Sequence, residues 1–306
     1  MIFHNHSEGT LVSENRPLVS ILMTAYNQEK YIKDAIESVL SSTFQDYELI
    51  IVDDASTDAT VKVIDGYLDL DKRIKFYKNE KNLGDYKNRN KAASYAIGKY
   101  LKYLDADDVI YPHGLEAMVS YMERFSDAAL GISLYQIELE LPYPIKMVPR
   151  EILRSEYLSK SVLGLGPSAA IIKRESFIEL NGFNDENYIS DTDLWLKIAT
   201  SYPIILFNPS LNWYRRHANQ QIANENKDYK IKLLRLEQKR KYLIINKCHF
   251  TESEFRYAEK RIAQHFSRLL LRDLMHGFNF NSFFYLYRKS KINIFDLMRG
   301  FRNYYQ

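Results

Sequence analysis

The sequence contains one cysteine, Cys248, and no run of about 18 apolar residues of the kind that spans a bilayer. A single cysteine excludes an intramolecular disulfide and suits a reducing compartment. The missing apolar run argues against a transmembrane helix. The N-terminal segment MIFHNHSEGTLVSENRP lacks the basic and apolar regions of a signal peptide. We therefore expect a cytoplasmic protein.

Glycine and proline are also scarce, at 11 and 8 of 306 residues, and no internal repeat is evident. The remaining composition, 46% hydrophobic and 26% charged, is that of a chain that buries a sizeable core. The net charge of +3 is unevenly spread, because residues 227–306 hold 18 Lys and Arg against 7 Asp and Glu. An acidic front part followed by a basic tail indicates two different roles.

The front part alternates short apolar runs with segments of helical spacing. Runs typical of buried parallel strands lie at 18–24, 47–52, 74–77 and 100–104. This alternation predicts an α/β fold with a mostly parallel central sheet flanked by helices. Further along, residues 128–141 alternate like an exposed strand.

Two acidic clusters directly follow predicted strands. Asp53 and Asp54 end the second run, and Asp105-Ala106-Asp107-Asp108 ends the fourth. Ligands of such sheets bind beyond the carboxyl ends of the strands. Three carboxylates within four residues repel each other, and a fold tolerates them best around a cation such as Mg²⁺ or Mn²⁺. Helix capping and solvated turns remain the alternative for individual residues.

A series of short motifs runs through the chain in a fixed order. They occupy residues 19–27, 50–58, 82–84, 105–108, 179–184, 190–197 and 214–217. Each is weak alone, but the ordered set resembles glycosyltransferase family 2, a large inverting family with the Rossmann-like GT-A fold. The resemblance implies a GT-A domain at residues 17–226, after an N-terminal tail of residues 1–16.

The resemblance implies donor-binding roles for five matching positions. Thr24, Tyr26 and Asp54 would line the pocket for the nucleotide base, on which Tyr26 could stack. Arg89 would reach the nucleotide, and Asp105 would face the ribose or the metal.

It implies metal and catalytic roles for four others. Asp107, assisted by Asp108, would bind Mn²⁺ or Mg²⁺, and His217 would approach the metal or the diphosphate. Asp191 would be the general base. Many relatives have Glu-Asp before the Asp-Leu-Trp segment, whereas Ser190 replaces the Glu here, a change that concerns acceptor contacts more than chemistry.

These roles describe one reaction. A carboxylate removes the proton of the acceptor hydroxyl, while a divalent ion stabilises the departing diphosphate. The expected activity moves a hexosyl or N-acetylhexosaminyl group from a nucleotide-diphosphate sugar, most commonly a UDP-sugar, to a glycan or lipid-linked glycan. The strong use of Lys and Tyr in a chain without a predicted membrane span suggests, by analogy, a bacterial polysaccharide enzyme.

Two other functions stay open. A sugar-nucleotide nucleotidyltransferase would be expected to carry a Gly-rich, basic phosphate loop early in the chain, and residues 24–28 do not form one. A catalytically inactive nucleotide- or glycan-binding module would not be expected to retain Asp54, Asp105, Asp107 and Asp191 together. Turnover that depends on a metal ion would distinguish the enzymes from this inactive module.

The basic tail, residues 227–306, lies outside the resemblance and is expected to be a helical extension. Its 16 Phe and Tyr among basic residues suit an anionic membrane surface, which would place the enzyme at the inner face of the cell membrane. Packing on the catalytic domain or on a second subunit of a homo-oligomer is the equally weighted alternative. No nucleic-acid motif accompanies the charge, so nucleic acid is not an expected partner.

Overall fold

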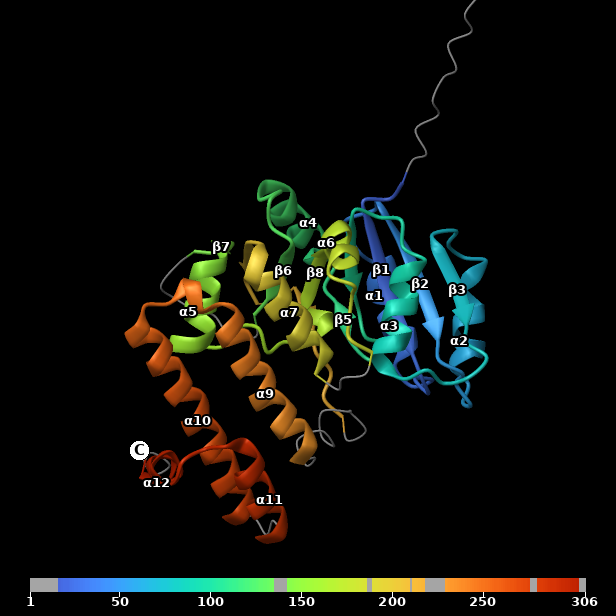
Figure 1. Ribbon diagram of the computed structural model, residues 1–306. Helices are drawn as coiled ribbons and strands as arrows, with labels where there is room; N and C mark the ends of the chain where they lie inside the picture. Colours follow the sequence, from blue (N-terminus) through green and yellow to red (C-terminus); the bar gives the residue numbers. More distant parts are fainter. Residues whose placement is uncertain are drawn as a thin grey trace, which may run out of the picture.

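An eight-stranded mixed sheet forms the centre of the protein in the computed structural model (Figure 1). The structure describes residues 16–134, 142–185, 189–209, 211–217, 229–275 and 280–302. The strand order is β3-β2-β1-β4-β8-β6-β9-β7. The expected tail at residues 1–16 lies outside the described residues except for Arg16.

Four parallel strands make up the first half of the sheet: β1 (Val19–Ala25), β2 (Tyr47–Asp53), β3 (Ile74–Lys78) and β4 (Tyr100–Tyr103). Every residue of β2 is buried. Alternate side chains of these strands enter two separate hydrophobic clusters, one on each face of the sheet. The near-continuous apolar runs in the sequence follow from this burial on both faces.

Helices cover both faces of this half. The helices α1 (Ile32–Leu40), α2 (Thr60–Leu68) and α4 (Gly114–Arg124) pack in the cluster that contains Met23 and Ile51. On the opposite face, α3 (Asp85–Ser94) contributes Ala92 to the cluster that contains Leu22 and Ile50. The predicted α/β fold with a mostly parallel sheet is confirmed.

The second half of the sheet is mixed. Strand β8 (Ala170–Lys173) lies antiparallel to β4 and to β6 (Leu130–Ser133). Strand β9 (Ile204–Phe207) is parallel to β6, and β7 (Ile145–Met147) closes this edge antiparallel to β9. All four residues of β6 are buried, so the expectation of an exposed strand is wrong for residues 130–133. Residues 135–141 lie outside the described part.

Several further elements lie between or after these strands along the chain. They are β5 (Val109–Ile110), β10 (Asn212–Trp213), α5 (Pro149–Leu158), the 3-10 helix η1 (Pro167–Ala169), α6 (Arg174–Glu179) and α7 (Ser190–Ser201). Strands β5 and β10 pair antiparallel as a separate two-stranded ribbon. This ribbon joins segments about a hundred residues apart.

The C-terminal part is helical, as expected. It consists of α9 (Tyr229–Ile245), the 3-10 helix η2 (Lys247–His249), α10 (Glu252–Met275), α11 (Phe280–Ser290) and α12 (Ile294–Arg302). Tyr242 and Leu243 of α9 join the hydrophobic cluster of the sheet, while Phe266, Leu270 and Phe283 form a third cluster. Figure 1 shows α11 and α12 at the end of this extension far from the sheet. Among the described residues, no helix combines the length and hydropathy needed to cross a membrane.

Candidate functional site

The residues that follow β1, β2 and β4 surround one large cavity at the carboxyl edge of the parallel strands. Its volume is about 1780 Å³. Eight of the nine predicted site residues line it: Thr24, Tyr26, Asp54, Arg89, Asp105, Asp107, Asp191 and His217. The ninth, Asp108, is fully buried beside them. The structure therefore brings the predicted residues together, as expected for strand ends that meet at one edge.

Asp54 lies at the end of β2 and is engaged by the protein itself. The side-chain amide of Asn79 and the backbone N–H of Leu83 donate to its Oδ1, both at 2.8 Å, and the N–H of Gly84 donates to Oδ2 at 3.0 Å. A carboxylate offers about four lone pairs, so one acceptor position remains. Asp54 thus fixes the 79–84 loop and can still accept one donor from a ligand. Tyr26, which is 47% exposed, presents its ring to the same cavity.

Arg89 bridges two carboxylates of the site. Its Nε donates to Asp85 Oδ1 at 2.8 Å, and its Nη1 lies 2.7 Å from Asp105 Oδ1. The guanidinium is buried. Burial would lower the pKa of Arg89, but the charges of Asp105 and Asp85 outweigh it and hold the pKa well above its usual value. Arg89 therefore positions Asp105 as a permanently charged partner.

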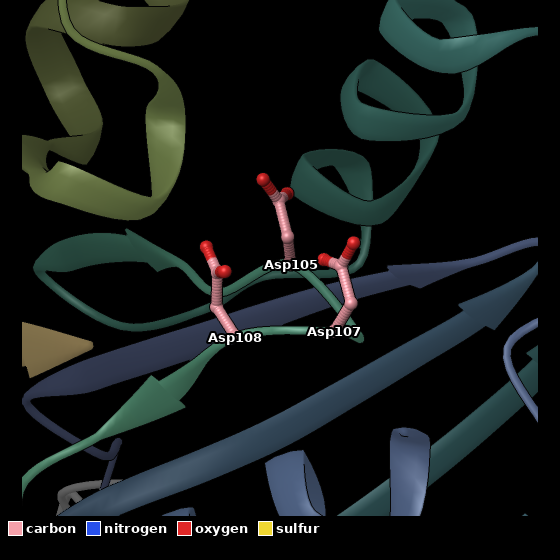
Figure 2. A group of neighbouring side chains, drawn as sticks. All are labelled: Asp105, Asp107 and Asp108. Atoms are coloured by element: carbon pink, nitrogen blue, oxygen red, sulfur yellow. The ribbon is translucent and has the colours of Figure 1, made fainter. Parts of the chain in front are cut away.

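The acidic cluster forms a compact oxygen-rich group on the turn after β4. Asp105, Asp107 and Asp108 each offer one carboxylate oxygen, and these atoms lie within 4.8 Å of one another. Figure 2 shows the three side chains rising to the same side of the turn. Burial, together with the charges of Asp105 and Asp107, raises the pKa of Asp108 to about 7. Such a donor set fits a hard divalent cation, which would remove the repulsion.

The β5–β10 ribbon carries the segment after β10 to the acidic cluster. The backbone N–H of Arg215 donates to Asp108 Oδ1 at 3.1 Å, and its Nε donates to the backbone oxygen of Asp107 at 2.8 Å. His217 Nε2 lies 2.8 Å from Asp107 Oδ2. Burial and the charge of Asp105 raise the pKa of Asp107, while the hydrogen bond with His217 opposes this rise. An imidazole thus lies next to the carboxylates.

Asp191 lies in the first turn of α7 and lines the same cavity as the acidic cluster. The backbone N–H of Thr192 donates to its Oδ1 at 2.6 Å. Burial raises the pKa of Asp191, while the hydrogen bond with Thr192, the charge of Arg89 and a hydrogen bond with Tyr86 act in the opposite direction. By contrast, Asp193 pairs with Lys197 at 3.0 Å and does not line the cavity. A carboxylate with raised basicity therefore faces the cavity at position 191.

Three contributors were missed from the sequence. Asp85 could have been found, because it precedes Arg89 by four residues on a helix. Lys102 is a charged residue within an apolar run, and its fully buried Nζ donates to the backbone oxygens of Tyr103, at 2.8 Å, and Ser168. Tyr86 meets Asp191 only through the tertiary fold, and no local pattern shows this.

Comparisons with known proteins agree on a family. The family described as "Glycosyl transferase family 2" matches residues 20–180. An uncharacterized glycosyltransferase of Methanocaldococcus jannaschii is 38% identical over 212 residues, which cover 66% of this chain and 71% of the relative. A putative teichuronic acid biosynthesis glycosyltransferase of Bacillus subtilis, TuaG, is 33% identical over 152 residues, or 49% of this chain and 60% of the relative.

Solved structures agree on the fold. TarS residues 1–349 of S. aureus, in complex with UDP-GlcNAc, has a TM-score of 0.63 at 17% identity and covers 94% of this chain and 91% of that one. The mannosyltransferase PcManGT from Pyrobaculum calidifontis, in complex with GDP-Man and Mn²⁺, has a TM-score of 0.56 at 15% identity. The match covers 87% of this chain and 77% of that one. The expected GT-A fold is confirmed.

Proposed function

The chain belongs to glycosyltransferase family 2, and we propose that it moves a hexosyl or N-acetylhexosaminyl group, with inversion, from a nucleotide-diphosphate sugar to a hydroxyl of a glycan. The observation that carries this proposal is that one cavity joins the acidic cluster to Asp191. A donor site and a general base on one cavity are what a single-displacement transfer requires. The similar structures hold UDP-GlcNAc and GDP-Man, and we propose a UDP-sugar as the donor.

Thr24, Tyr26 and Asp54 would hold the base. Tyr26 is exposed enough to stack on it, and the remaining lone pair of Asp54 would accept an N–H of the base. Arg89 would act on the nucleotide mainly by fixing Asp105, since its guanidinium contacts the carboxylates of Asp85 and Asp105.

A divalent ion, Mn²⁺ or Mg²⁺, fits the acidic cluster. Asp107 and Asp108 would hold it with Asp105 close by, and His217 would add an imidazole or orient Asp107. When bound, such an ion supplies positive charge that stabilises the departing diphosphate.

Asp191 would accept the proton of the acceptor hydroxyl. Its raised pKa makes it a stronger base than an exposed aspartate, and Tyr86 and the N–H of Thr192 would fix its orientation. Charged Arg89 nearby would stabilise the ionised form before transfer. The hydroxyl could then attack the anomeric carbon from the side opposite the leaving group.

The test measures nucleoside diphosphate release from a panel of nucleotide sugars, with and without Mn²⁺ or Mg²⁺. Asp191→Asn should keep nucleotide binding and lose turnover about a hundredfold or more, the usual contribution of a general base. Asp107→Asn should lose metal-dependent nucleotide binding. Asp69→Asn, which removes an exposed carboxylate outside the cavity, is the matched control. Turnover of Asp191→Asn near that of wild type would refute the base, and failure of every donor with every metal would favour an inactive binding module.

We also propose that α11 and α12 rest on an anionic membrane, which would place the enzyme at the inner face of the cell membrane beside a lipid-linked glycan. Phe280, Phe284 and Phe295 are 57–69% exposed. The exposed basic residues Arg288 and Lys289 lie on the same helix as two of these rings. Exposed aromatic rings among cations are typical of interfacial helices. Sedimentation with phosphatidylglycerol vesicles tests this location, and concentration-dependent dimerisation without vesicle binding would assign the surface to a second copy.

A further inference from the structure

The proposed base lies at the start of a helix that packs against the C-terminal extension. Asp191 is in the first turn of α7. Tyr242 of α9 joins the hydrophobic cluster that contains Trp195 of α7. The family match ends at residue 180 and leaves α9 without an assigned role. The contacts between the two helices indicate what this role is.

Two buried side chains of α9 contact the first turn of α7. Gln238 Nε2 donates to the backbone oxygen of Ile189 at 3.3 Å, and Tyr242 donates to Asp193 Oδ1 at 3.0 Å. The backbone N–H of Asp193 donates to the same oxygen of Ile189 at 3.1 Å and closes the turn. Gln238 and Tyr242 are four residues apart, so they lie on one face of α9. Asp191 lies between the two contact points, two residues from each.

The contact with Tyr242 ties this turn to another element of the protein. The N–H of Thr192 donates to Asp191, but Thr192 belongs to the same turn and moves with it. Asp193 also pairs with Lys197 at 3.0 Å, and this partner likewise lies on α7. The hydrogen bond from Tyr242 is buried and has a carboxylate acceptor, two conditions that make a hydrogen bond strong. It therefore fixes the turn relative to α9.

We propose that Tyr242, assisted by Gln238, is a positioning residue for the proposed base Asp191. The inference rests on the proposed transferase function, because it concerns the base of that site. Tyr86 orients the carboxylate of Asp191 from α3, and α9 holds the turn that carries it. A general base acts only within hydrogen-bond reach of the acceptor hydroxyl, and a misplacement of about 1 Å can lower the rate about a hundredfold. Tyr242 does not line the cavity, so it contributes to the reaction without touching a ligand there.

The test compares Tyr242→Phe with Thr200→Val. Each variant keeps nearly the same side-chain shape and removes one hydrogen bond between α9 and α7, because Asn246 Nδ2 of α9 donates to Thr200 Oγ1 at 3.1 Å. Thr200 lies at the far end of α7 from Asp191 and does not line the cavity. Nucleoside diphosphate release gives kcat and the donor KM, and calorimetry gives the affinity for UDP with Mn²⁺. Thermal unfolding checks that both variants fold.

Tyr242→Phe should lower kcat about tenfold, since a small displacement of the base slows proton removal. The donor KM and the affinity for UDP should stay unchanged, because the proposed donor residues lie on other elements. Thr200→Val should keep the wild-type kcat at a similar loss of thermal stability. In the Asp191→Asn background, Tyr242→Phe should cause no further loss, because its effect passes through the carboxylate of Asp191. If Tyr242→Phe does not fold, Gln238→Met removes the second contact and serves in the same comparison.

The proposal is overturned by a wild-type kcat in Tyr242→Phe or by equal losses of kcat in Tyr242→Phe and Thr200→Val. It is also overturned if Tyr242→Phe causes the same fractional loss with Asp191 and with Asn at this position, since that result describes a purely structural role. If wild type turns over no donor with any metal, the transferase function and the positioning role fail together. If wild type is active and Tyr242→Phe is equally active, only the positioning role fails.

Discussion

The buried lysine beneath the acidic cluster allows a quantitative prediction. Lys102 on β4 has no exposed surface, and its Nζ donates to two backbone oxygens that tie β4 to the turn at Ser168. Ser168 Oγ in turn accepts the backbone N–H of Asp105 at 2.8 Å. Burial lowers the pKa of Lys102 to about 7, although Asp108 and Asp105 act in the opposite direction. Lys102 thus supports the cluster largely as a neutral amine above that pH.

The direction in which stability changes with pH follows from the number of protons that the folded and unfolded states bind. In the unfolded chain a lysine keeps its proton up to about pH 10.4, whereas in the folded protein Lys102 loses it above about pH 7. Between these values the unfolded state binds one more proton, so stability rises with pH by about 1.4 kcal/mol per unit. From about pH 8 to about pH 9.5 this group adds about 2 kcal/mol to the free energy of unfolding.

Lys102→Met removes this titration. Urea unfolding across the same pH range should show wild-type stability rising by about 2 kcal/mol relative to the variant. Loss of the donor to the two backbone oxygens costs about 1–3 kcal/mol at every pH, which shifts the curve without changing its slope. Lys62→Met, at an exposed position of α2, is the control and should keep the wild-type slope. Parallel profiles of wild type and Lys102→Met would mean that Lys102 stays protonated in the folded protein, and the reasoning would be refuted.

Two further predictions concern packing and the metal. Gly98→Ala should lower stability by about 1–3 kcal/mol, because a Cβ would lie 2.6 Å from the backbone nitrogen of Ser20. Gly66→Ala on α2 should raise the stability by about 0.5–1 kcal/mol, because a Cβ there meets nothing within 4 Å. Urea unfolding measures the stability of both glycine variants, and changes of the same sign would contradict the packing argument. His217→Asn should weaken Mn²⁺ binding about tenfold, as followed by the paramagnetic resonance signal of free Mn²⁺, and wild-type affinity would leave His217 as only a hydrogen-bond partner of Asp107.

The strands and their polar ends could be predicted from the sequence because the signals are local. Apolar runs bounded by Asp54 and Asp105 show where β2 and β4 end, and parallel strands place those ends on one edge. Arg89 and Asp85 are four residues apart on α3, so even their ion pair is local. Such contacts depend on helix and strand geometry alone.

Contacts between distant segments could not be predicted from these patterns. His217 reaches Asp107 because β10 pairs with β5, and the short strands give no periodic signal of that pairing. The alternation at residues 128–141 suggests one exposed face, yet β6 lies between β8 and β9 and is covered on both sides. His217 was expected at the site only from the resemblance to a family, because no local sequence pattern indicates its contact with Asp107.

The uneven charge of the sequence suggested two roles, and the structure suggests how these roles meet. The boundary at residue 226 stays a prediction, but the packing is continuous beyond it. Tyr242 of α9 donates to Asp193 at 3.0 Å, on the helix that begins beside the proposed base. The same helix α9 contributes Gln238 and Lys239 to the lining of the cavity. The position of α9 is therefore linked to that of α7, which a charge count along the chain cannot reveal.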